Sequence, residues 1–231
     1  MAQRTLARQH QKSMTRINNA VQSEVMRVVR GFDGEPFHVV KDGLRDLVPL
    51  IAHDYGDAAG ALAQDYYEMA REAAEIPGFV DLGPAARVNG EAVDNSIRWS
   101  LRHATGELPQ LELLSTELGA SIARKVLDVD ADTITSASVK DKRSVGWSRL
   151  TDAGACAFCR MLADRGAVYT GASVRFASHD HCGCTAMPMF NNERNYRAVK
   201  TLPYQASQRR LSEAQQATMR ARVRDYLGAN Y

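Results

Sequence analysis

Residues 5–29 read TLARQHQKSMTRINNAVQSEVMRVV and contain neither proline nor glycine. Apolar side chains recur there mainly at helical spacings, which predicts one long amphipathic helix. The apolar positions are Leu6, Ile17, Val21, Val25, Val28 and Val29. The stripe is thin and its N-terminal half is polar, so we expect the helix to dock on other elements rather than form a core alone. Gly31 and Gly34 are expected to end it.

Helical patterns continue beyond this segment. Residues 38–75 carry two apolar stripes, and Pro49 and Gly56 mark a kink or a break between them. Residues 76–90 hold three glycines and two prolines, which predicts a loop. The first part of the chain is therefore expected to alternate long helices with short connections.

Helices are predicted again at about 91–104 and 108–127, and a further one is expected to begin at a cap on Asp130 or Asp132. Trp99 stands between apolar neighbours, so we expect it in the core. The first 145 residues are thus predicted to form a mainly helical scaffold.

The pattern changes over residues 145–190, where short alternating pieces are separated by glycines. A strand is expected near Trp147, which should pack under the segment. The other expected pieces are a short helix at 156–163 and strands at 167–169, 174–176 and 185–190. This segment is predicted to be a small α+β module whose core is too small to be stable without a staple.

A cluster of cysteines and histidines lies inside this module. The chain has four cysteines, and all of them fall between Cys156 and Cys184. They form the pair Cys156-Ala-Phe-Cys159 and, after a gap of 19 residues, the run His179-Asp-His181-Cys182-Gly-Cys184. Two such knuckles at this separation are typical of a tetrahedral zinc site, because soft thiolates together with imidazole select zinc.

Six candidate ligands compete for four positions. The preferred set is Cys156, Cys159, His179 and Cys182, and Cys184 is the main rival to His179 or Cys182. His181 is expected beside the site or on the surface, although it is also an alternative ligand. With enough cysteines to close the coordination shell, the zinc is expected to be structural rather than catalytic.

Two other readings of the cysteines are weaker. Two disulfides would fit their number, but the N-terminus has no apolar leader segment, so we expect a compartment that disfavours disulfides. A thioredoxin-like redox pair normally follows a buried strand in a βαβ unit, and no such pattern stands here.

Charge divides the chain although the formal net charge is only +2. Residues 1–30 carry six basic and one acidic residue, residues 31–135 carry eight basic and nineteen acidic, and residues 136–231 carry fifteen basic and seven acidic. This asymmetry suggests an assembly component, or contact with nucleic acid or an acidic partner. Alternatively, these charges are solvated surface groups, and the basic and acidic regions attract each other within one chain.

The tail beyond Pro203 is predicted to hold a basic amphipathic helix. Its arginines are candidates for contact with nucleic acid or a partner, at Arg209, Arg210, Arg220, Arg222 and Arg224. The predicted divisions are therefore 1–30 (basic N-terminal helix), 31–145 (helical scaffold), 146–190 (zinc-binding α+β module) and 191–231 (basic helical tail). The expected fold class is mainly α, with a small α+β module.

Some functional classes find no support in the sequence. No apolar run approaches the roughly 18 residues that a membrane-spanning helix needs, so no membrane association is expected. The sequence contains no H-E-x-x-H, G-x-S-x-G, Walker or G-x-G-x-x-G motif, and no nucleophile–base pair stands out. Catalysis is therefore not expected from the residues themselves.

The segments GWSRLTDAGACAFCRMLADRGAVY and SHDHCGCTAMPMF, placed after a helical scaffold, resemble the Mu F-like head-morphogenesis proteins of tailed phages. These minor capsid proteins often end in C-x-x-C…H-x-x-C-x-C, and Cys156, Cys159, His179, Cys182 and Cys184 occupy those positions. The specific resemblance covers about 145–190 and is closest to versions from actinobacterial phages. An Asp-His pair stands where the broader pattern often has Pro-Asn, which leaves the role of His181 open.

The resemblance implies a virion component inside the capsid near the portal, present in the host cytoplasm during assembly. It implies the portal protein as partner, with the major capsid or scaffold protein and packaged DNA as further candidates. The implied role is in procapsid assembly, DNA packaging or ejection. Because many such proteins are labelled capsid maturation proteases, cleavage of scaffold or capsid protein is the alternative activity.

Overall fold

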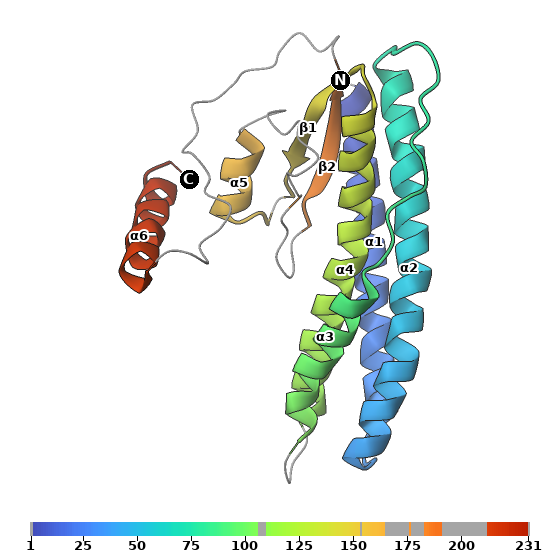
Figure 1. Ribbon diagram of the computed structural model, residues 1–231, viewed down its shortest axis with the longest axis vertical. Helices are drawn as coiled ribbons and strands as arrows, with labels where there is room; N and C mark the ends of the chain where they lie inside the picture. Colours follow the sequence, from blue (N-terminus) through green and yellow to red (C-terminus); the bar gives the residue numbers. More distant parts are fainter. Residues whose placement is uncertain are drawn as a thin grey trace.

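The computed structural model describes residues 2–105, 110–152, 154–164, 176, 183–190 and 212–230. In these residues the chain is mainly helical, and the helices and strands follow one another as Figure 1 shows. The elements are α1 (Ala2–Arg30), α2 (Phe37–Ala73), α3 (Gly90–Ser100), a 3-10 turn (Leu101–Ala104), α4 (Leu111–Lys140), β1 (Ser144–Leu150), α5 (Ala157–Asp164), β2 (Thr185–Phe190) and α6 (Glu213–Asn230).

Helices α1, α2 and α4 run side by side along the long axis of an elongated bundle, and α3 packs against α4 near one end (Figure 1). The predicted N-terminal helix is confirmed, and its apolar stripe is the part of α1 that enters the core. Val21, Val25 and Val29 are fully buried among residues of α2 and α4. The thin stripe of α1 is thus sufficient because two partner helices cover it.

Helix α2 continues without interruption through Pro49 and Gly56, so no break divides residues 38–75. Gly56 serves close packing instead. A Cβ atom at Gly56 would lie 2.3 Å from Cγ2 of Val88, and one at Gly60 would lie 2.9 Å from Cβ of Ala85. These glycines let the connection between α2 and α3 cross α2 at close range.

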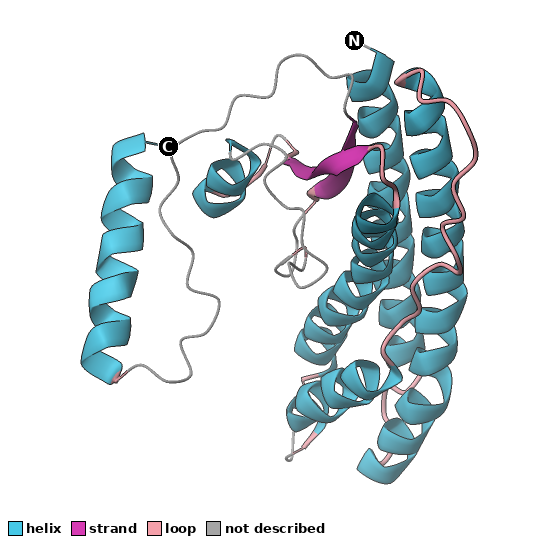
Figure 2. Ribbon diagram, turned by 45° about the horizontal axis from the view of Figure 1, so that its top comes forward, coloured by secondary structure: helices cyan, strands magenta, loops and turns pink. Residues whose placement is uncertain are grey.

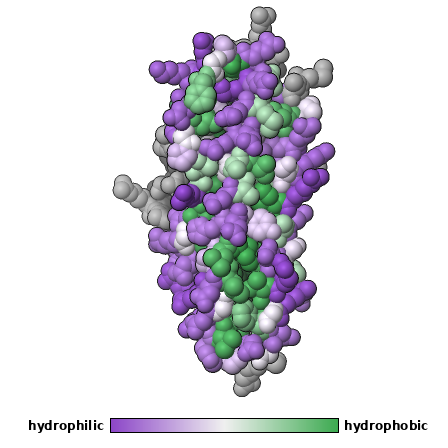
Figure 3. Space-filling view, turned by 90° about the vertical axis from the view of Figure 1, so that its right-hand side faces the viewer, coloured by the Kyte–Doolittle hydropathy of each residue, from purple (hydrophilic) through white to green (hydrophobic). Residues whose placement is uncertain are grey.

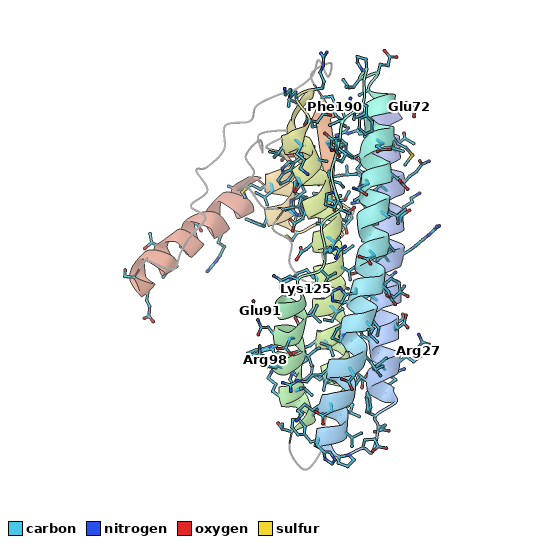
Figure 4. All side chains as sticks on the ribbon, turned by 45° about the vertical axis from the view of Figure 1, so that its right-hand side comes forward. Arg27, Glu72, Glu91, Arg98, Lys125 and Phe190 are labelled. Carbon is cyan, nitrogen blue, oxygen red and sulfur yellow. The ribbon has the colours of Figure 1, made fainter. Side chains whose placement is uncertain are left out.

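Strands β1 and β2 form an antiparallel two-stranded ribbon that packs against α4. Figure 2 shows the ribbon between the helical bundle and α5. Trp147 in β1 is 2% exposed and joins a second apolar cluster with Tyr66 and Phe190, so the expected packing of this tryptophan is confirmed. Phe190 lies at the same end of the bundle as Glu72 (Figure 4) and meets the ring of Tyr67 edge-on at 5.8 Å.

A buried ion pair ties α2 to the turn between α4 and β1. The Arg71 guanidinium donates to a carboxylate oxygen of Asp141 and, at 2.9 Å, to the carbonyl oxygen of Gly78. The Tyr67 hydroxyl donates to the same Asp141 oxygen at 3.3 Å. Burial, followed by the negative charge of Asp141, raises the pKa of Tyr67, which keeps the phenol protonated as a donor.

Two further predictions about the scaffold are wrong. Trp99 is 67% exposed and stacks under the Arg102 guanidinium at 4.1 Å. It stands two positions from the buried Ile97, and residues two apart on a helix face different sides. Helix α4 also runs unbroken through Asp130 and Asp132, so neither residue caps a new helix.

Three of the elements predicted within residues 145–190 are present in the structure. The strands near Trp147 and at 185–190 and the short helix after Cys156 are present, and α6 occupies the predicted basic tail. The predicted strand at 167–169 and all but the last residue of the one at 174–176 lie outside the described residues; Phe176 itself is not in a strand. Among the described residues, no helix is long and apolar enough to cross a membrane.

Candidate metal centre

The first cysteine knuckle lies at the start of α5, just after β1. The Cys159 amide donates to Sγ of Cys156 at 3.5 Å, and the Arg160 amide bonds the Cys156 carbonyl at 3.0 Å. Cys156 is exposed, whereas Cys159 is 1% exposed. A C-x-x-C pair on a turn into a helix presents its two sulfurs toward one side, as a zinc knuckle requires.

Arg149 in β1 places a buried positive charge beside this knuckle. It is 4% exposed, and its Nη1 atom lies 3.9 Å from Sγ of Cys159. The guanidinium also lies over the ring of Phe176, 3.8 Å from the ring centre. A cation at this position stabilises a thiolate, which is the form of cysteine that binds metals.

The second knuckle is described only at its end. His179, His181 and Cys182 lie outside the described residues, and Gly183 and Cys184 precede β2. A Cβ atom at Gly183 would lie 2.1 Å from Oδ2 of Asp152, so a larger residue there would displace the Asp152 side chain. Gly183 therefore lies close to Asp152, in the segment that leads to the first knuckle.

Cys184 is half-buried and faces the bundle. It lines a cavity of about 170 Å³ together with Met14 of α1, and with Leu127 and Asp130 of α4. Within the part of the chain that the structure describes, no three His, Cys, Asp or Glu side chains form a group that could hold a metal ion. Cys184 thus does not join Cys156 and Cys159 in such a group.

One stretch of α1 holds the chain on both sides of the candidate centre. The Arg8 guanidinium donates to the carbonyl oxygen of Thr151 at 2.5 Å, just after β1. The Gln11 side-chain amide donates to the carbonyl oxygen of Gly183 at 2.8 Å, just before β2. Arg8 also donates to Oε1 of Gln11 at 2.8 Å, so the two anchors support each other.

A buried polar cluster continues this anchoring. Nε2 of His10 lies 2.6 Å from Oδ1 of Asp130, and the Thr185 hydroxyl donates to Oδ2 of Asp130 at 3.1 Å. The His10 ring stacks on Tyr66 with 4.2 Å between ring centres. The cluster therefore joins α1, α2, α4 and the first residue of β2, and it explains why Asp130 is tolerated inside α4.

This cluster brings an imidazole, a carboxylate and a hydroxyl together, but not in a catalytic order. The hydroxyl donates to the carboxylate, whereas a nucleophile would need to donate to the imidazole. His10, Asp130 and Thr185 are each no more than 7% exposed. The arrangement suits structural anchoring. In the sequence it could be found only from polar residues at helix positions of α1 and α4 that would otherwise be apolar.

The arginines of the tail are placed only in part. Arg220, Arg222 and Arg224 lie on α6, and Arg224 is exposed. Arg209 and Arg210 lie outside the described residues.

Replacing Gln11 by alanine removes the anchor of Gly183. We expect the free energy of unfolding to fall by about 1 kcal/mol, the usual net value of such a hydrogen bond. Amide hydrogen exchange in β2 should become faster, while exchange in α3 stays unchanged. The matched control is Gln9→Ala, because Gln9 is exposed on the same helix. Equal exchange in β2 for both variants would contradict the anchoring role.

The fold and the site together define a class: an elongated helical bundle that carries a small cysteine-containing strand–helix–strand module. The chain belongs to the VG15 protein family, which it matches over residues 1–208. This membership indicates a phage-encoded protein. Comparison with the curated proteins and with the solved structures gives no match.

Proposed function

We propose that this chain is a Mu F-like minor head protein of a phage, bound to the portal inside the capsid. It acts there in procapsid assembly, DNA packaging or ejection, through a module stapled by structural zinc. The observation that carries the proposal is the knuckle module fixed to the bundle by Arg8 and Gln11. Membership of a phage protein family agrees with it.

The proposed zinc ligands are Cys156, Cys159, His179 and Cys182. The described half of the site suits the metal, because an amide–sulfur contact arranges the first knuckle and the Arg149 cation lies beside Cys159. Cys184 faces the bundle cavity instead, which supports Cys182 as the ligand from the second knuckle. Zinc would supply the cohesion that a two-stranded ribbon and one short helix lack.

The architecture also supports an assembly role. The bundle is elongated (Figure 1), and the acidic middle of the sequence is flanked by basic segments on both sides. Basic segments can meet packaged DNA or an acidic portal surface. The polar cluster at Asp130 does not order a nucleophile against a base, so this cluster does not support the protease alternative.

The test is complementation of a phage from which this gene has been deleted. The wild-type chain should restore DNA-filled heads and sediment with purified portal protein, and Cys156→Ser/Cys159→Ser should fail in both assays. Cys184→Ser is the matched control and should complement. Filled, infectious heads without any copy of the chain would overturn the proposal. Defined cuts in scaffold or capsid protein, seen by mass spectrometry after incubation with the purified chain, would replace it by the protease alternative.

A further inference from the structure

The outward side of α2 carries a row of exposed apolar side chains, which we call the α2 outer face. Leu50 is 60% exposed and Met69 is 45% exposed. The row consists of Leu47, Leu50, Ala58, Ala61, Leu62 and Met69. Figure 3 shows this side of the molecule, with its densest apolar patch in the lower half. Single exposed apolar residues are ordinary, but a row along one helix is typical of an interaction surface.

Acidic residues accompany this row. Asp54, Asp57, Asp65 and Glu68 are all exposed, and α2 has no lysine or arginine between Arg45 and Arg71. None of these four carboxylates forms an ion pair with a described residue. Such a surface repels nucleic acid and favours a partner that combines apolar side chains with positive charge.

The chain itself contains a helix of this kind. Met219, Val223 and Leu227 follow one another at intervals of four residues in α6, and arginines stand between them at 220, 222 and 224. Helix α6 contacts α5 and lies away from the bundle, on the side opposite α2 (Figures 1 and 2). In this placement α6 does not reach the α2 outer face of its own chain, but it is accessible to another molecule.

We propose that the α2 outer face binds helix α6 of a second copy of this chain. The two surfaces differ and lie on opposite sides of the molecule, so the contact is head-to-tail and can repeat from one copy to the next. Apolar contact between the two helices and attraction between the α2 carboxylates and the positive charges of α6 hold the two copies together. The assembly is therefore weakened by salt.

Sedimentation velocity of the full chain, over a range of protein concentrations, tests the self-association. We expect concentration-dependent association at low salt that weakens at high salt. Asp54→Lys/Asp65→Lys and Arg220→Glu/Arg222→Glu/Arg224→Glu should each weaken it by roughly tenfold or more, because like charges then face each other. Mixing the two variants should restore association, since the unchanged α6 of the first variant meets the unchanged α2 outer face of the second, and the two altered surfaces attract each other.

The matched control is Asp33→Lys/Glu35→Lys, which reverses two exposed carboxylates outside the α2 outer face. It should associate like the wild type. The mixing experiment also distinguishes a broken interface from misfolding, because two misfolded variants would not regain association when mixed. A chain that stays monomeric at every concentration would overturn the proposal, and so would association that neither charge reversal changes.

Photo-crosslinking identifies the occupant. A benzoylphenylalanine at position 62 should crosslink to peptides from residues 212–230. With a mixture of ¹⁵N-labelled and unlabelled chains, the crosslinked pairs should include labelled–unlabelled pairs. Crosslinks confined to single chains would show α6 folding back on its own bundle, and crosslinks to other peptides would show another interface. Either result overturns the proposal.

Discussion

Cys159→Ser is expected to leave the purified protein without zinc and its module unfolded. Structural zinc contributes roughly 10–16 kcal/mol of apparent binding free energy in zinc-finger peptides, and that energy is coupled to folding. Losing the buried Cys159 sulfur should therefore release β1, α5 and β2 while the helical bundle persists. Metal analysis by mass spectrometry gives the zinc content. Fluorescence of Trp147, which is 2% exposed, should shift to the red as the module opens.

Cys184→Ser is the matched control for this prediction. It removes a thiol from the same cluster, but one that faces the cavity beside Met14. We expect it to retain about one zinc ion per chain, with fluorescence like the wild type. Equal loss of zinc in both variants would instead put Cys184 into the ligand set, and wild-type protein that takes up no zinc would contradict the metal site itself.

Arg71→Met is expected to lower the free energy of unfolding by about 3–5 kcal/mol, because it leaves the Asp141 charge buried without its partner. The hydrogen bonds from Arg71 to the carbonyl oxygens of Pro77 and Gly78 are lost as well. Chemical denaturation followed by far-ultraviolet circular dichroism measures the change. The loss should be large because this pair closes the end of the bundle where β1 begins.

Two further variants make this test specific. Arg98→Met breaks an exposed pair with Asp94, one helical turn away at 2.9 Å, and should cost at most about 0.5 kcal/mol. Adding Asp141→Asn to Arg71→Met should cost less than the sum of the two single changes, since the buried charge is then gone. A loss for Arg71→Met no greater than that for Arg98→Met would refute the role of the buried pair.

The helices could be predicted because their signals are local. Val21, Val25 and Val29 repeat at helical spacing within a segment free of glycine and proline, and all three are fully buried. Trp99 shows the limit of that reasoning. Its apolar neighbours suggested a core position, but its angular position on α3 turns it to solvent.

For the candidate site, the sequence predicts metal ligands, which stay a prediction, but it does not predict the residues that anchor the module. The spacing of Cys156 and Cys159 predicts a knuckle, and α5 begins directly after Cys156 and carries Cys159. The anchoring residues could not be recognised, because Asp130 and Gln11 become meaningful only when they meet partners 120 and 172 residues away in the chain. No local pattern encodes such distant pairs, and polar residues in a helix usually face water.

The anchors on α1 also bear on how the protein is made. Gln11 leaves the ribosome 172 residues before Gly183, the partner that it finally holds. Because translation adds about 5–20 residues per second, roughly 10–30 s pass before the side-chain amide of Gln11 can donate to Gly183. All the helices of the bundle are thus synthesised before Gln11 meets its partner in the module. Translation speed, or a chaperone on the emerging helix, should therefore affect the yield of folded protein more than changes in the loop between α1 and α2.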